Sequence, residues 1–193
     1  MCIRDRFDEH KTQEKGNPLI LWNHRWEYDK NPEVFFKCLY KLKKNNITFD
    51  LAVLGESFHN KPNVFDEVKS RLKDNILHFG FCESFPEYAR WLWLADLTPV
   101  TNNQDFFGGS VVESIYCGAY PILPNRLTYP ELLPKEFHND HIYDNDYELY
   151  DKVKDCILNI DEIRKTKIHK EFKKYDWGIM CPVYDKFFSS LIN

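Results

Sequence analysis

The sequence contains no apolar run near the length of about 20 residues that a membrane-spanning helix requires. It also lacks an excess of positive charge, because 30 acidic residues outnumber 26 lysines and arginines and give a net charge of -4. This balance argues against a broad basic face that would bind nucleic acid by itself. Internal repeats and low-complexity segments are absent as well. We therefore expect an ordinary globular protein that does not cross a membrane.

Paired cysteines are also missing. The six cysteines are scattered and include no Cys-x-x-Cys pair, so neither a zinc site nor a disulfide framework is indicated. Four of them fall on predicted helices, where we expect buried thiols. Unpaired cysteines are typical of a reducing compartment, and we therefore expect a cytoplasmic protein.

The chain has 193 residues, 43% of them hydrophobic and 16% aromatic, enough for one sizeable core or two small ones. Residues 1–6 are similar to the in-frame translation of a transposon-based sequencing adapter. We interpret these six residues as a read artefact. Residues 7–17 are polar and are expected to form a linker, and we interpret the chain as the C-terminal part of a longer protein. The folded domain is expected at residues 18–193.

Short apolar runs alternate with amphipathic segments along this domain. The alternation predicts a parallel sheet with helices on both faces, an α/β fold. Ligands of such sheets bind outside the carboxyl ends of the strands, which here precede loops 23–30, 55–61, 80–83 and 101–109. The predicted strands are residues 18–22, 49–54, 76–79, 97–100, 120–123 and 141–143.

Capping patterns locate the helices between these strands. Asn31 followed by Pro32 predicts a helix start, and Ser84 with Glu87 forms a capping-box pattern. Further helices are expected at residues 63–72, 84–95, 110–117 and 129–133, and a helical tail from Asp146 with breaks near Asp161 and Trp177.

The most informative segment is Asp105 to Glu113, where two carboxylates lie eight positions apart with Gly108 and Gly109 between them. The glycines allow a sharp turn and the close approach of a ligand. A helix that begins at about Ser110 would direct its first N–H groups and its dipole toward a diphosphate. The same pattern also fits a helix whose loop requires glycine and whose carboxylates face water.

A second candidate segment is the loop after the first strand, which carries Arg25 and Lys30. Guanidinium and ammonium groups bind phosphate oxygens and stabilise a leaving diphosphate as its charge develops. A solvated loop with a Glu27/Lys30 pair is the alternative. His24 in the same loop either orients a hydroxyl group of a ligand or caps a turn.

Three other groups have weaker patterns. His138, Asp140, His141 and Asp144 lack a known metal-ligand spacing, which favours a polar loop. The residues 144–146 spell Asp-x-Asp but are typical of a helix cap. A run of lysines near the C-terminus is expected to form a solvated helix face, although an RNA acceptor could use it. The run consists of Lys165, Lys167, Lys170, Lys173 and Lys174.

These segments resemble the retaining glycosyltransferases of family 4, which have the GT-B fold. That family carries a Glu-x7-Glu segment, represented here by Asp105 and Glu113, and an Arg/Lys pair, represented by Arg25 and Lys30. The sequences of residues 20–33, 99–108 and 123–131 are similar to those of the tRNA-queuosine α-mannosyltransferase group. The resemblance covers about residues 18–190 and implies the C-terminal, donor-binding half of a GT-B enzyme, a Rossmann-like domain.

The resemblance implies a role for each candidate residue. Arg25 and Lys30 would hold the diphosphate of the donor, and the amides around Gly109 and Ser110 would add to this site. No metal or other cofactor is implied, since cations and a helix N-terminus would stabilise the leaving group. The residues implied to be catalytic are Arg25, Lys30 and Asp105, and those implied to bind the donor are Gly55, Gly80, Gly108, Gly109, Ser110 and Glu113.

The remaining roles concern the sugar and the base. Glu113 would bind the ribose, Asp105 the mannose hydroxyls, and loop residues near Gly55 and Gly80 the guanine. Asp105 departs from the glutamate that is usual in the family, and its side chain is shorter by one methylene.

The implied reaction is transfer of mannose from GDP-mannose to queuosine in aspartate tRNA, with retention of the anomeric configuration. A missing N-terminal half would supply the tRNA site, so this half alone is expected to bind GDP weakly and to be inactive. Two alternatives are a family 4 enzyme with another sugar donor and a glycan or lipid acceptor, and a non-catalytic module that binds nucleotide sugars.

Overall fold

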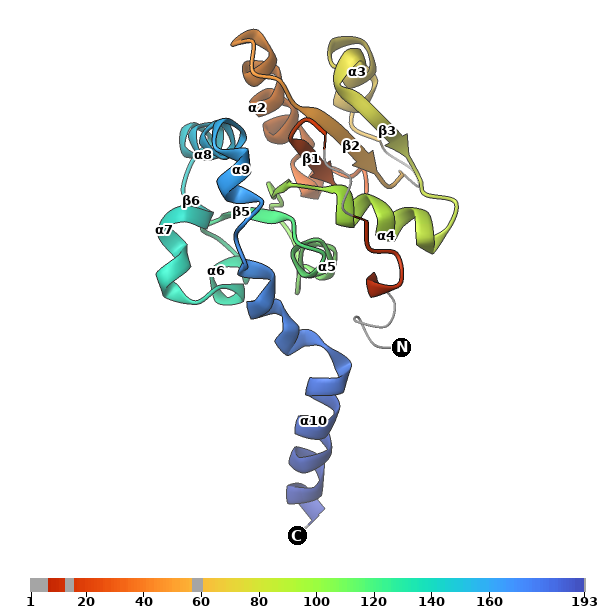
Figure 1. The fold of residues 1–193 in the computed structure, drawn as a ribbon, viewed down its shortest axis with the longest axis vertical. Helices are drawn as coiled ribbons and strands as arrows, with labels where there is room; N and C mark the ends of the chain where they lie inside the picture. The colour runs from red at the N-terminus through yellow and green to blue at the C-terminus, as the bar shows by residue number, and fades with distance from the viewer. Residues whose placement is uncertain (1–6, 13–15, 57–60, 193) are drawn as a thin grey trace.

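The computed structural model describes residues 7–12, 16–56 and 61–192. Met1 to Arg6, for which an adapter origin was predicted, and part of loop 55–61 lie outside the described residues. The described chain forms a six-stranded sheet in the order β3-β2-β1-β4-β5-β6, and every neighbouring pair is parallel (Figure 1). The strands are β1 (Leu19–Trp22), β2 (Asp50–Leu54), β3 (Ile76–Gly80), β4 (Leu97–Pro99), β5 (Tyr120–Pro124) and β6 (Ile142–Tyr143).

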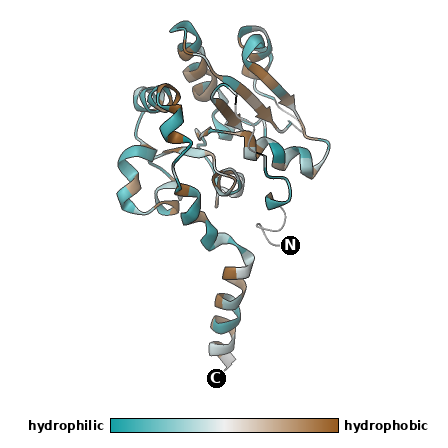
Figure 2. Ribbon diagram, in the orientation of Figure 1, coloured by the Kyte–Doolittle hydropathy of each residue, from teal (hydrophilic) through white to brown (hydrophobic). Residues whose placement is uncertain are grey.

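Helices pack on both faces of this sheet, as the alternating pattern predicts. Successive strand residues point to opposite faces, so Ile20 and Trp22 enter one core cluster, and Leu19 and Leu21 enter another. Figure 2 shows that β1 and β2 are hydrophobic along their length, as expected for strands that are covered on both sides. The first face carries α2 (Pro32–Lys44), α3 (Val64–Arg71) and α8 (Asp146–Leu158), and the second carries α4 (Phe85–Leu94) and α5 (Gly109–Tyr116).

Shorter elements connect the layers. At the C-terminal end, α10 extends away from the body of the domain (Figure 1). Within the described residues, no helix combines the length and the apolar character needed to cross a membrane. The connecting elements are η1 (Tyr28–Lys30), η2 (Lys73–Asn75), α6 (Tyr129–Leu132), η3 (Lys135–Phe137), α7 (His138–His141), α9 (Ile160–Ile163) and η4 (Ile168–Tyr175), and the projecting helix α10 comprises Trp177–Ile192.

Two predicted caps are confirmed. Ser84 Oγ accepts a hydrogen bond from the amide of Glu87 at 3.3 Å, although the Glu87 carboxylate accepts from the amide of Glu83 and not from Ser84. Asn145 Oδ1 accepts from the amides of Tyr147 and Glu148, so the Asp-x-Asp text at residues 144–146 is a helix cap.

Four expectations are corrected. Asn31 adopts the left-handed conformation at φ 53° and its side chain makes no capping bond. His141 ends α7, so the last strand begins at Ile142. Phe7, expected in a polar linker, is fully buried against Phe85 of α4 because its ring is apolar. Cys181 is exposed on the projecting α10, whereas the other described cysteines are buried.

Candidate functional site

Two loops interlock at the carboxyl ends of β1 and β4, where the strand order reverses direction. The carbonyl of Asp29 accepts the amide of Asn103 at 2.7 Å, and the ammonium group of Lys30 donates to the carbonyl of Gln104 at 2.8 Å. Thr101 Oγ1 donates to the carbonyl of Lys30 at 2.9 Å. A reversal point of this kind is the usual ligand-binding position in open α/β sheets.

The two predicted cations of this site have different environments. The side chain of Lys30 is 11% exposed, and its ammonium lies 3.1 Å from an Asp29 oxygen and 3.8 Å from Asp105 Oδ2. Arg25 is 58% exposed and contacts Glu27 at 3.2 Å. Lys30 therefore joins the two loops, and Arg25 offers an accessible guanidinium to a ligand.

Asp105 is held by its own loop and by Tyr129 of α6. Its Oδ2 accepts hydrogen bonds from Asn102 Nδ2 and Tyr129 Oη, both at 2.9 Å, and its Oδ1 accepts from the Gly108 amide at 3.1 Å. Burial disfavours the charged form, but these bonds and the nearby Lys30 outweigh burial and lower the pKa of Asp105. In this arrangement the carboxylate shapes the turn that leads into α5.

The start of α5 is open toward this turn. Gly108 has a left-handed φ of 78°, and the first amide that bonds within the helix is that of Val112, which donates to the Gly108 carbonyl at 2.9 Å. A Cβ added at Gly109 would meet nothing within 4 Å. The helix therefore presents amides without intrahelical acceptors next to empty space, the geometry that suits a phosphate group.

His24 and Asn23 attach the first loop to α5. His24 Nδ1 lies 3.1 Å from Ser110 Oγ, and Asn23 Nδ2 donates to the Ser110 carbonyl at 2.7 Å. Gly55 allows this arrangement, because a Cβ there would lie 2.6 Å from the carbonyl oxygen of His24. The predicted site residues of β1, β2 and α5 are thus brought together.

Glu113 and Gly80 lie on the side of the site that faces α4. Glu113 Oε2 accepts a hydrogen bond from Tyr88 Oη at 2.8 Å. Burial, and then the charge of Glu113, raises the pKa of Tyr88, so this hydroxyl remains a donor. Gly80 ends β3 at φ 140° with open space around its Cα.

The side chains that position the predicted residues were not among the candidates expected from the sequence. Besides Tyr88 and Tyr129, these include Arg126, which donates from Nε to the Asn102 carbonyl at 2.8 Å and from Nη2 to the Thr101 carbonyl at 2.6 Å. Their sequence spacing carries no signal, because they reach the site from α4 and from the turn after β5. The family resemblance of residues 123–131 includes Arg126 and Tyr129, but it assigned no role to either residue.

The weaker metal candidate is not assembled as a cluster. His141 Nδ1 lies 2.8 Å from the Pro121 carbonyl, and Asp144 Oδ1 accepts from Asn125. Among the described residues, a different group has side-chain ligand atoms close enough together to hold a metal ion, namely His78, Cys82 and Glu87. There His78 Nε2 already lies 3.1 Å from the Gly80 carbonyl, and Glu87 caps α4.

The buried His24 predicts an acid-sensitive fold. Burial, followed by the charge of Lys30, lowers the pKa of His24 from 6.5 to about 4. The contribution of the neutral imidazole to the free energy of unfolding is complete above about pH 6.5 and is lost as the pH falls toward 4, by up to about 3 kcal/mol.

Urea unfolding between pH 7.5 and 4 would measure this loss. His24→Gln should remove a large part of the pH dependence, whereas His10→Gln, which lies outside the site beside Phe85, should leave most of it in place. An identical pH dependence of wild type and His24→Gln would contradict the assignment.

Comparison with known proteins gives this geometry a family context. The family model of the glycosyl transferases group 1 matches residues 4–174. A tRNA-queuosine alpha-mannosyltransferase of Drosophila melanogaster is 38% identical over 117 residues, which are 61% of this chain and 31% of that protein. The chain thus spans about a third of the length of this curated relative, and the resemblance to its group is confirmed.

Solved structures share the fold at low identity. HepE of Anabaena in complex with UDP has a TM-score of 0.70 at 16% identity, over 90% of this chain and 49% of that one. The C-terminal domain of the group 1 protein LpcC of Francisella tularensis has a TM-score of 0.64 at 15% identity, over 89% of both chains. The predicted GT-B half is confirmed, and with the match over residues 4–174 the chain belongs to the glycosyl transferases group 1 family.

Proposed function

We propose that this chain is the donor-binding half of a retaining mannosyltransferase that uses GDP-mannose and modifies queuosine in tRNA. The observation that supports this most strongly is the open N-terminus of α5 between the interlocked loops, in a chain 38% identical to a tRNA-queuosine alpha-mannosyltransferase. A diphosphate at the Gly109 and Ser110 amides would gain hydrogen bonds and the helix dipole.

The chemical contribution of this half is stabilisation of the leaving group. As the bond from the sugar to the diphosphate breaks, negative charge develops on GDP and the sugar becomes oxocarbenium-like. The helix N-terminus and the accessible Arg25 would stabilise that charge, and Lys30, which also joins the two loops, would add to it. Because these groups supply the positive charge that the leaving diphosphate needs, we expect that the reaction requires no metal or other cofactor.

The sugar and ribose contacts follow from the two carboxylates. Glu113, oriented by Tyr88, is available to accept from ribose hydroxyls. Asp105 Oδ2 accepts from Asn102 and Tyr129 and shapes the turn, whereas Oδ1 accepts only the Gly108 amide and would retain a lone pair for a mannose hydroxyl. The tRNA acceptor would bind largely to a part of the enzyme beyond this chain, and we expect no mannose transfer by the chain alone.

A panel of nucleotides tests the donor. GDP and GDP-mannose should raise the melting temperature, UDP and UDP-glucose should do so less, and EDTA should not change the result. Arg25→Ala should reduce the GDP shift strongly while leaving the melting temperature of the apoprotein nearly unchanged, because this side chain is exposed.

Lys44→Ala, an exposed lysine at the end of α2, is the matched control and should keep the full shift. Equal GDP shifts in wild type and Arg25→Ala would refute the phosphate assignment. A larger shift with UDP-glucose would support the second candidate, a UDP-sugar transferase, which is favoured by neighbours solved with UDP and UDP-glucose.

A further inference from the structure

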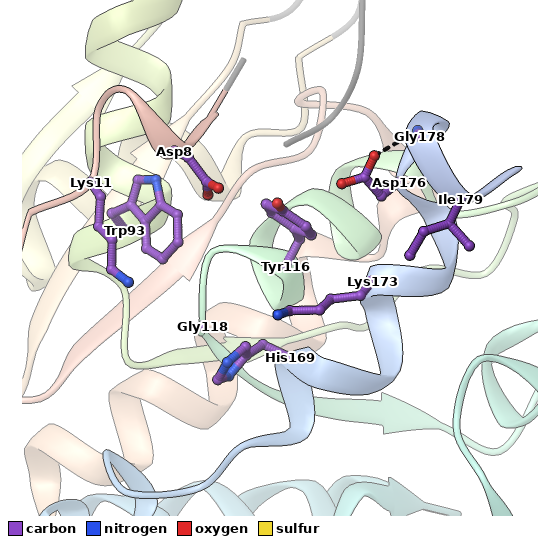
Figure 3. A pocket seen from close by; sticks show the side chains of 10 residues that line it. All are labelled: Asp8, Lys11, Trp93, Tyr116, Gly118, His169, Lys173, Asp176, Gly178 and Ile179. Atoms are coloured by element: carbon purple, nitrogen blue, oxygen red, sulfur yellow. Dashed lines mark hydrogen bonds between the residues drawn. The ribbon is translucent and has the colours of Figure 1, made fainter. Parts of the chain in front are cut away.

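A groove of about 640 Å³ lies beside the α5 helix, apart from the donor site (Figure 3). Lys11 and Trp93 line one side, and His169 and Lys173 of η4 line the other. Figure 3 shows the ammonium ends of Lys11 and Lys173 and the His169 ring gathered around the same space, below Tyr116 in this view. The groove thus gathers positive groups from two segments that are far apart in the sequence.

The positive charge continues along η4 beyond the groove. In a 3-10 helix, side chains three residues apart eclipse one another and rise by about 6 Å. Lys170 and Lys173 have this spacing within η4, Lys167 immediately precedes the helix, and all three are exposed, while Ile168 and Phe172 face the core. The spacing predicts that Lys170 and Lys173 lie along one edge of the helix, with Lys167 next to its first turn.

The electrostatic surroundings of His169 support this convergence. Burial, followed by the charges of Lys173, Lys11, Lys170 and Lys167, lowers the pKa of His169. Two acidic residues also line the groove, Asp8 and Asp176. Asp176 Oδ1 accepts the Gly178 amide at 2.8 Å at the start of α10, so this carboxylate serves the helix end. Within the groove, two lysines balance these two carboxylates, and the excess positive charge comes from the exposed Lys167 and Lys170 along η4, so an anionic ligand is favoured there.

We propose that the groove and the η4 lysine line bind the phosphodiester backbone of a single-stranded stretch of RNA. Lysines about 6 Å apart suit successive phosphates of an extended strand, and Lys11, 5.0 Å above the Trp93 ring, adds a cation on the opposite wall. A concave groove with a linear array of charges fits a strand better than a flat lipid surface. The inference rests on the proposed function, because it identifies where the RNA acceptor extends onto this half.

The test measures the affinity of the 193-residue chain for a fluorescent, unstructured 12-nucleotide RNA at several salt concentrations. The triple variant Lys167→Ala, Lys170→Ala, Lys173→Ala should bind at least about tenfold more weakly at low salt. Its slope of log affinity against log salt should be shallower by about 2, the value expected for three lost phosphate contacts with single-stranded RNA. Lys11→Gln, on the opposite side of the groove, should weaken binding by itself and make the slope shallower by about 0.7.

The control variant removes the same charge from another surface, Lys37→Ala, Lys44→Ala, Lys73→Ala, and should change affinity less than about twofold. Absence of RNA binding by the wild type, equal losses in both triple variants, or binding to vesicles with anionic lipid in place of RNA would each overturn the proposal. GDP-induced melting shifts in the same variants separate the two proposals. An intact GDP shift without RNA binding defeats the groove alone, and lysine-dependent RNA binding without any GDP shift defeats the donor site alone.

Discussion

Gly55→Ala is expected to lower the free energy of unfolding by about 2–4 kcal/mol, because two separate costs coincide at this position. Gly55 has a φ of 98°, in a region that alanine rarely adopts. In addition, the new Cβ would lie 2.6 Å from the carbonyl oxygen of His24, which is closer than two such atoms approach in folded proteins. The loop that carries His24 and Arg25 must move to relieve this contact.

Gly118→Ala isolates the first cost. Its φ of 103° is close to that of Gly55, but a Cβ there would meet nothing within 4 Å. We expect a loss of only about 1–2 kcal/mol from the backbone conformation. Chemical denaturation of both variants measures the difference. Equal losses of unfolding free energy in the two variants would show that the close approach of Gly55 to the His24 carbonyl adds no cost, which would contradict the prediction.

Gly109→Val is expected to weaken GDP binding at least tenfold while the free energy of unfolding changes by no more than about 0.5 kcal/mol. Gly109 is the first residue of α5, and its surroundings are empty to 4 Å. Valine is tolerated in a helix at least as well as glycine, so folding is little affected. The new side chain would instead occupy the space through which a diphosphate reaches the amides.

Gly109→Ala provides a graded control for the same position. A single methyl group should weaken GDP binding less than valine does, and it should leave the fold as stable as before or slightly more stable. Calorimetric titration of GDP gives the affinities, and thermal unfolding gives the stabilities. Wild-type affinity in the valine variant would show that the phosphate binds elsewhere.

The sheet was predictable because each strand is a short apolar run that ends at a loop. A parallel strand buried on both faces needs such a run, and β1 has the four buried residues Leu19–Trp22. The strand order was not available from this pattern, since nothing local to β1 indicates that β4 lies beside it. Phe7 was missed for a related reason, because a single aromatic residue among polar neighbours has no periodicity.

The candidate site residues could be proposed from the sequence, but their partners could not. The pattern assigns Lys30 and Asp105 to loops that follow neighbouring strands, and their ligand contacts stay predictions. Their roles within the loops depend on Gln104, Asn102 and Tyr129, which reach them through space. Hydrogen-bond networks across loops depend on the register of the whole sheet, which a single sequence segment does not contain.

The central claim is that the N-terminus of α5 binds the diphosphate of a nucleotide sugar. Titration of GDP into the isotopically labelled chain, followed by the shifts of the backbone amide resonances, tests it most directly. We expect saturable shifts that are largest at Gly109 and Ser110, together with the amides of loop 23–30. Saturable shifts centred on another surface, such as the η4 groove, or no shifts at millimolar GDP, would contradict the claim.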